Sequence, residues 1–90
     1  VEASLSYPET VAAGEYFQVT WDGPGAAHDY VDVVPVGYKD TSGELSYAYT
    51  RDGETLDIRA PEEAGRYDLR YVLEGQRGRR VILTETLVVE

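Results

Sequence analysis

The chain has 90 residues, a formal net charge of −9 and no cysteine, which fits one domain that buries roughly 60–65% of its extended surface on folding. The acidic excess excludes a surface that attracts nucleic acid phosphates or anionic lipids, and no apolar run is long enough for membrane insertion. Without cysteine the chain forms no disulfide and has no thiolate nucleophile or metal ligand. We therefore expect a single domain, residues 1–90, that binds neither nucleic acid nor membrane.

Four strands are predicted in the first half of the chain. Apolar and polar residues alternate through 3–7, 16–21, 30–36 and 45–50, as in strands with one buried face. The residues in phase along these strands are Ala3, Leu5, Tyr7, Phe17, Val19, Trp21, Val31, Val33, Leu45, Tyr47 and Tyr49. Polar loops that contain Pro8, Gly14 and the sequence Gly23-Pro24-Gly25 separate the strands.

Three further strands are predicted in the second half. Asp52-Gly53 is a strong hairpin signal, and it precedes an alternating segment at 55–60. A corner at 61–65 leads to a strand at 66–74, and the loop 75–78 leads to a last strand at 79–90. Strict alternation would bury Glu85 in that last strand, so we expect a bulge near Thr84–Thr86 to correct the register.

The segment after Pro61 has the pattern of a sandwich corner followed by a central strand. Tyr67, Leu69, Tyr71 and Leu73 occupy every second position, which favours a strand over an amphipathic helix at 61–74. In immunoglobulin-like sandwiches a tyrosine commonly starts the sixth strand, and its hydroxyl bonds back to the backbone of the corner. Tyr67 has the position for that role.

Seven short strands with turn signals between them are typical of an immunoglobulin-like sandwich. We therefore expect an all-β fold, a seven-stranded antiparallel β-sandwich in one domain. The structural residues that we expect in its core or corner are Phe17, Trp21, Tyr67, Leu69 and Tyr71. The indole N–H of Trp21 then needs a partner, which a nearby loop could supply.

Few residues suggest chemistry. No catalytic or cofactor-binding set is recognisable, and His28 is the only histidine, so neither a His-based metal site nor a catalytic triad is expected. Asp22, Asp29 and Asp52 fall in loops at one end of the predicted sandwich, together with Arg77, Arg79 and Arg80. These carboxylates are weak candidates for calcium, and ion pairing or solvation is the other interpretation.

Three tyrosines fall outside the core phase and are candidates for an exposed binding surface. They are Tyr16, Tyr30 and Tyr38. Exposed tyrosines anchor sugars and protein partners well, although scattered surface tyrosines are also ordinary.

The string "PETVAAGEYFQVTWDGPG…DYVDVVP…YAYT…APEEAGRYDLRY" resembles an immunoglobulin-like module that recurs in bacterial, mainly proteobacterial, proteins, often beside von Willebrand factor A domains. The resemblance covers roughly residues 3–89; "DYVDVVPVG" is also faintly similar to the SKICH-type sandwich domain. The resemblance to the bacterial immunoglobulin-like module implies a non-catalytic module of a larger exported protein, located outside the cell, on its surface or in the periplasm. It implies no particular functional residue.

These observations lead to two functional expectations. The first is a structural, adhesion or protein-interaction module, strung in tandem or in a fibre, whose partners are other domains of the same polypeptide or other proteins. The second is a module that binds carbohydrate or peptide through exposed tyrosines and end loops. A small hydrolase would need paired acids in a cleft, and no enzyme activity is expected. The chain begins with Val and has no Met, which suggests a processed product or a domain of a longer protein.

Overall fold

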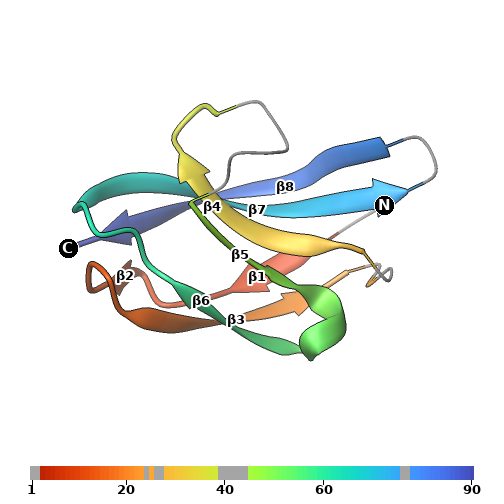
Figure 1. Ribbon diagram of the computed structural model, residues 1–90, viewed down its shortest axis with the longest axis horizontal. Coiled ribbons are helices and arrows are strands. Elements are labelled where there is room, and N and C mark those ends of the chain that lie inside the picture. The colour runs from red at the N-terminus through yellow and green to blue at the C-terminus, as the bar shows by residue number, and fades with distance from the viewer. Residues whose placement is uncertain (1–2, 24, 26–27, 39–44, 76–77) are drawn as a thin grey trace.

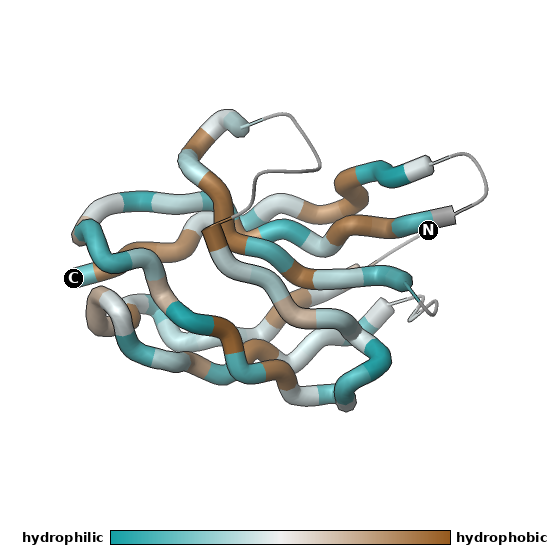
Figure 2. Tube along the Cα trace, viewed as in Figure 1, coloured by the Kyte–Doolittle hydropathy of each residue, from teal (hydrophilic) through white to brown (hydrophobic). Residues whose placement is uncertain are grey.

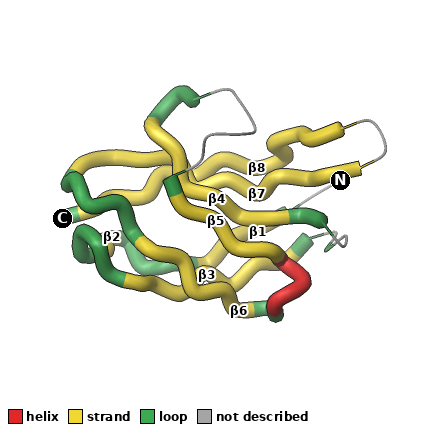
Figure 3. The backbone as a smooth tube through the Cα atoms, in the orientation of Figure 1, coloured by secondary structure: helices red, strands yellow, loops and turns green. Residues whose placement is uncertain are grey.

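The computed structural model describes residues 3–23, 25, 28–38, 45–75 and 78–90. They form an all-β fold of two sheets (Figures 1 and 3). The strands are β1 (Ser4–Ser6), β2 (Thr10–Val11), β3 (Tyr16–Asp22), β4 (Tyr30–Pro35), β5 (Ser46–Tyr49), β6 (Thr55–Arg59), β7 (Gly65–Gly75) and β8 (Gly78–Val89). One 3₁₀ turn, η1 (Thr50–Asp52), links β5 to β6.

The smaller sheet has the order β1-β3-β6 and the larger sheet the order β2-β8-β7-β4-β5. The described residues thus contain eight strands, whereas the sequence predicts seven. The additional strand is β2, in the segment expected to be a loop, where Thr10 and Val11 pair in parallel with Val88 and Val89. All other pairs are antiparallel.

The core lies between the facing sides of the two sheets. Alternating side chains supply it, as the brown and teal positions along β6 show in Figure 2. Its buried residues are Val11, Phe17, Val19, Val31, Val33, Leu56, Ile58, Ala60, Leu69, Tyr71, Leu87 and Val89. Phe17, Leu69 and Tyr71 are therefore in the core, as the sequence predicts.

The corner before β7 is held by the tyrosine that the sequence singles out. The Tyr67 hydroxyl donates a hydrogen bond of 2.7 Å to the carbonyl oxygen of Glu63, four residues earlier. Gly65 opens β7 with φ +149°, a backbone conformation that side chains with a Cβ rarely adopt. The predicted corner hydrogen bond is thus confirmed.

We expect Tyr67→Phe to lower the free energy of unfolding by about 0.5–1.5 kcal/mol, because one hydrogen bond is lost while the ring remains. Urea denaturation measures the change. Tyr16→Phe is the matched control, since Tyr16 is 71% exposed, and it should leave the midpoint unchanged. An equal loss in both variants would contradict the corner's role.

Trp21 and Tyr71 form a linked pair at the end of the sandwich where β3 ends. Their ring centroids lie 6.1 Å apart, and the Trp21 indole N–H donates to the carbonyl oxygen of Gly53 at 2.7 Å. The Tyr71 hydroxyl donates to Asp29 Oδ2 at 2.8 Å and accepts from the Gly25 N–H, also at 2.8 Å. Trp21 is only partly buried, but its predicted loop partner is confirmed.

The pKa of Tyr71 is raised to about 12; burial is the largest cause, the Asp29 carboxylate also raises it, and the Gly25 N–H partly offsets these effects. An unfolded tyrosine has a pKa of about 10. The stability that comes from the neutral phenol is therefore complete below about pH 10 and is lost as the pH rises towards 12.

A phenolate absorbance titration tests this value. We expect one of the 8 tyrosines to ionise near pH 12 in the folded chain, and we expect Tyr71→Phe to remove that step. The step should persist in Tyr67→Phe. Ionisation of Tyr71 near pH 10 in the folded chain would refute the prediction.

Two local predictions about the turns are wrong. Asp52-Gly53 does not close a paired hairpin, because β5 and β6 belong to different sheets and η1 carries the chain between them (Figure 3). The bulge in β8 is at Ile82 and not near Thr84–Thr86, since Tyr71 pairs with Leu83 while Val72 pairs with Val81. Glu85 therefore stays on the core side of β8, opposite Leu69.

Candidate binding surface

The outer side of β4 and β5 carries a cluster of three tyrosines, here called the tyrosine face. Tyr30 pairs with Tyr49 across the two strands, and Tyr47 follows on the same side of the sheet. The ring centroid of Tyr30 lies 6.1 Å from the centroids of Tyr47 and Tyr49, and the latter two centroids are 5.6 Å apart. All three ring pairs are arranged edge to face. Aromatic rings prefer this geometry, so the three rings already pack on one another in the free chain.

Two arginines flank the tyrosine face. The Arg51 guanidinium carbon lies 4.7 Å from the Tyr49 ring centroid, and that of Arg79 lies 5.6 Å from the Tyr30 ring. Arg79 also donates to Glu74 at 3.3 Å, which raises the pKa of Arg79 above its ordinary value. A chain of net charge −9 thus presents cations and aromatic rings together at this place.

A buried ion pair lies beside the tyrosine face on the same side of the sheet. Arg70 Nε donates to Asp32 Oδ1 at 2.8 Å and Arg70 Nη2 donates to Asp32 Oδ2 at 2.6 Å, the bidentate geometry of a strong pair. Arg70 Nη1 also reaches the carbonyl oxygen of Tyr38 at 3.2 Å. Arg70 and Asp32 are 1% and 0% exposed, so the pair is buried although both residues lie on the outer side of the sheet.

The same contacts hold the start of the β4–β5 connection on the sheet. The Tyr38 ring centroid lies 6.0 Å from the Arg70 guanidinium carbon, and the Gly37 N–H donates to Asp68 Oδ2 at 3.0 Å. The ion pair therefore fixes the direction in which the chain leaves β4.

One side of β5 forms no hydrogen-bonded strand pair among the described residues, because β5 ends the larger sheet, although residues of β6 lie close to β5. Thr50 donates its N–H to the carbonyl oxygen of Asp29 in the same register as the β4–β5 ladder, so these two residues form a hydrogen-bonded pair. In an antiparallel ladder such pairs alternate with pairs whose backbone groups point away. The N–H and C=O groups of Tyr47 and Tyr49 therefore point to the open edge, while those of Ala48 face β4.

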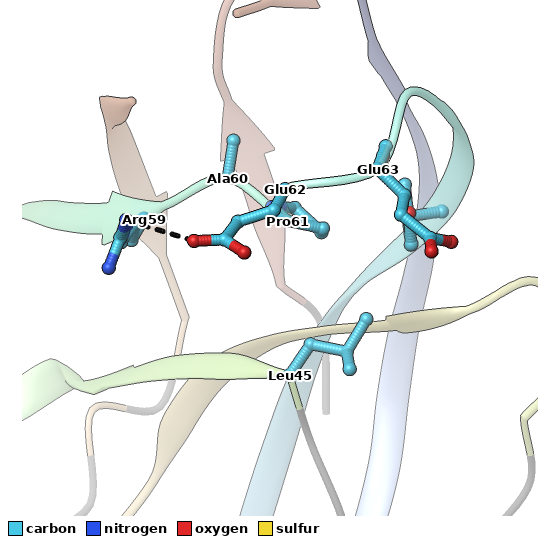
Figure 4. Close-up of a pocket in the computed structure, with 7 residues that line it drawn as sticks. Leu45, Arg59, Ala60, Pro61, Glu62 and Glu63 are labelled. Carbon is cyan, nitrogen blue, oxygen red and sulfur yellow. Dashed lines mark hydrogen bonds and ion pairs between the residues drawn. The ribbon is translucent and has the colours of Figure 1, made fainter. Parts of the chain in front are cut away.

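A pocket of about 350 Å³ lies at the ends of β5 and β6 that are remote from η1. Its lining residues are Leu45, Arg59, Ala60, Pro61, Glu62, Glu63 and Tyr67. In Figure 4 the Leu45 side chain points towards the segment that carries Ala60 and Pro61, and Arg59 pairs with Glu62 at 3.4 Å. We call this the seam pocket, since it lies between the larger and the smaller sheet.

The structure separates the three tyrosines that the sequence proposes as a surface. Tyr16 is 71% exposed but lies on β3 of the smaller sheet, Tyr30 is only 3% exposed, and Tyr38 is partly buried. The prediction of an exposed Tyr30 is wrong because its neighbours Tyr47 and Tyr49 and the stacked Arg79 cover its ring.

The three calcium candidates are not brought together as a site. Asp29 is fully buried and accepts hydrogen bonds from the Tyr71 hydroxyl and from the Glu74 N–H at 3.0 Å. Asp22 and Asp52 are exposed, and no group of three His, Cys, Asp or Glu residues in the described part of the chain could hold a metal ion. His28 is exposed, and Arg77 lies outside the described residues.

Sequence reasoning missed Tyr47 and Tyr49, because it placed them in phase with the core. The inward positions of β5 are instead the small residues Ser46 and Ala48, and Tyr47 is 50% exposed. The local sequence holds no signal for this: Tyr47 and Tyr49 are outward because they pair with Asp32 and Tyr30, which alternate against the core residues Val31 and Val33.

Among the described residues, no helix has the length and apolar character needed to cross a membrane. Protein family models give no match to this chain, and neither do curated proteins. The role of the tyrosine face and the seam pocket is therefore inferred from their geometry.

Proposed function

We propose that the chain is an immunoglobulin-like sandwich that serves as a non-catalytic structural, adhesion or protein-interaction module. Two features support the immunoglobulin-like topology: the two-sheet order with β7 central in the larger sheet, and the tyrosine corner between Tyr67 and Glu63. Strand β5 joins the larger sheet at its edge. It therefore has one side available for a partner.

The observation that carries this proposal is the tyrosine face on an edge strand. Tyr47 is 50% exposed, the Tyr49 ring packs edge to face with it, and Arg51 lies over the Tyr49 ring. Tyrosine and arginine are both enriched among the residues that dominate binding at protein interfaces. Because the rings already pack on one another, binding orders few side chains, which reduces the entropic cost of association.

The surroundings of the module follow from the resemblance of its strands to bacterial immunoglobulin-like modules found beside von Willebrand factor A domains. We place the module in a larger exported or cell-surface bacterial protein, outside the cell, on its surface or in the periplasm. The partners are other domains of that polypeptide or separate proteins, in tandem or in a fibre, and no cofactor takes part.

A second candidate function is the binding of a glycan at the tyrosine face. Sugar rings pack on exposed aromatic rings, and the Tyr47 ring offers such a surface next to the hydrogen-bond donors of Arg51. The partner is then a carbohydrate instead of a protein, and end loops can add contacts.

Selection experiments distinguish these functions. The chain is used to select from displayed fragments of its source genome and is also applied to a glycan array. We expect enriched protein fragments whose affinity falls about tenfold or more in Tyr47→Ala/Arg51→Ala, as at an interface hot spot, and is unchanged in Tyr16→Ala. Glycan hits with the same sensitivity would favour the second function. Both proposed functions would be overturned if the selected fragments and glycans bound the double variant as tightly as the unaltered chain, or if neither experiment gave a ligand.

A further inference from the structure

We propose that β5 receives an extended peptide as an additional strand and that the seam pocket accepts one of its aliphatic side chains. This rests on the proposed function and specifies the partner: a short peptide segment with alternating aliphatic residues and a basic residue at its end. Addition of a strand to an open sheet edge is a recurring mode of peptide recognition, in which main-chain hydrogen bonds give affinity and pockets give specificity.

The backbone of β5 is arranged for such an addition. Tyr47 and Tyr49 direct their N–H and C=O groups to the open edge, as the β4–β5 register requires. No described strand pairs with that side. Natural proteins usually protect an edge with charge, proline or a bulge, and Ser46–Tyr49 contains neither charge nor proline.

The side chains on the two sides of β5 suit alternating residues of an added strand. Successive residues of a strand point to opposite faces, so half of the peptide would lie beside Tyr47 and Tyr49 on the outer face. The other half would point between the sheets, where Ser46 and Ala48 are small and the seam pocket is about 350 Å³. Leu45, Ala60 and Pro61 give that pocket an apolar lining.

The charges near the seam pocket favour a cationic peptide end. Glu62 and Glu63 are exposed at its rim, and Arg59 offsets one of them through its 3.4 Å contact with Glu62. The net charge of −9 also attracts a basic peptide at long range. The rim therefore complements Lys or Arg next to the inserted aliphatic residue.

The test uses a capped peptide of about eight residues that alternates Thr with Val or Leu and has Lys at each end. We expect saturable binding by calorimetry, with shifts of the Tyr47 and Tyr49 amide signals in NMR spectra. Methylation of alternate peptide amide nitrogens, on the edge that faces β5, should weaken binding about tenfold or more, because backbone hydrogen bonds are lost. Unchanged binding of the methylated peptide would overturn strand addition, whether or not any variant of the chain folds.

Two matched pairs of variants locate the contact. Tyr47→Pro removes an N–H that faces the open edge, while Tyr47→Thr keeps it and removes the same ring; we expect about tenfold weaker peptide binding for Pro than for Thr. Glu63→Lys should weaken binding of the Lys-ended peptide, and Glu9→Lys, at an exposed site that does not line the pocket, should not.

The outcomes separate this proposal from the function on which it rests. If Tyr47→Pro and Tyr47→Thr weakened peptide binding equally, the Tyr47 ring would matter and the backbone edge would not. That result would overturn strand addition and leave the proposed interaction module untouched. Concentration-dependent pairing of the chain through β5, abolished by Tyr47→Pro and blocking the peptide, would also overturn the peptide as occupant.

Discussion

The variant Arg70→Met is expected to lower the free energy of unfolding by about 3–5 kcal/mol, because it removes the positive charge and the two hydrogen bonds that Arg70 gives to the buried Asp32 carboxylate. Asp32 is 0% exposed and receives two hydrogen bonds from Arg70. The same change frees the carbonyl oxygen of Tyr38. Urea denaturation measures the loss, and NMR signals of residues near Tyr38 should shift with it.

Two controls make this prediction specific. Arg66→Met, at an exposed position of the same strand, should change stability by less than about 0.5 kcal/mol. The double variant Asp32→Leu/Arg70→Met should recover most of the loss, since apolar residues of similar volume often replace a buried ion pair without cost. A loss below about 1 kcal/mol in Arg70→Met would indicate that water reaches the pair.

The variant Glu85→Leu is expected to raise the free energy of unfolding by about 1–3 kcal/mol. Glu85 lies on the core side of β8 opposite Leu69, and its buried Oε2 atom has no hydrogen-bond partner among the described residues. An unsatisfied buried polar atom costs about that amount. The pKa of the Tyr7 phenol is raised chiefly by burial, and the negative charge of Glu85 is the second cause.

Thr84→Leu is the matched control for this prediction, because Thr84 is exposed on the opposite side of β8. It should give no comparable gain in the urea midpoint. In Glu85→Leu the absorbance titration of Tyr7 should also move towards lower pH, as the neighbouring negative charge is removed. Destabilisation by Glu85→Leu would mean that the carboxylate makes a favourable contact.

Much of the all-β fold is predictable from the sequence, because a buried face forces period-two alternation. Phe17, Leu69 and Tyr71 lie in the core where alternation places them, and Tyr67 closes the corner. In β8 the alternation continues from Leu83 to Val89 and leaves Glu85 on the core side, because the bulge is at Ile82 and not at the position that would turn Glu85 outward. Strand pairing cannot be predicted from local sequence patterns, because it joins residues far apart in the chain, such as Thr10 and Val88 in their parallel contact.

The candidate site is less predictable, because both faces of β4 are buried. Tyr30, Asp32 and Val34 alternate against the core and yet are at most 3% exposed, since Tyr47, Tyr38 and Arg70 cover the outer side. Alternation assigns such residues to solvent, and it assigns the aromatic residues of β5 to the core. Only the register of β4 against β5 shows that Tyr47 and Tyr49 belong to the outer face.

Hydrogen exchange at the β5 amides tests the open edge most directly. In the free chain we expect the amides of Tyr47 and Tyr49 to exchange quickly and that of Ala48, which faces β4, to exchange slowly. Addition of the Lys-ended peptide should slow the two tyrosine amides selectively. Equal protection of the Tyr47, Ala48 and Tyr49 amides in the free chain would contradict an open edge and, with it, the binding role assigned to β5.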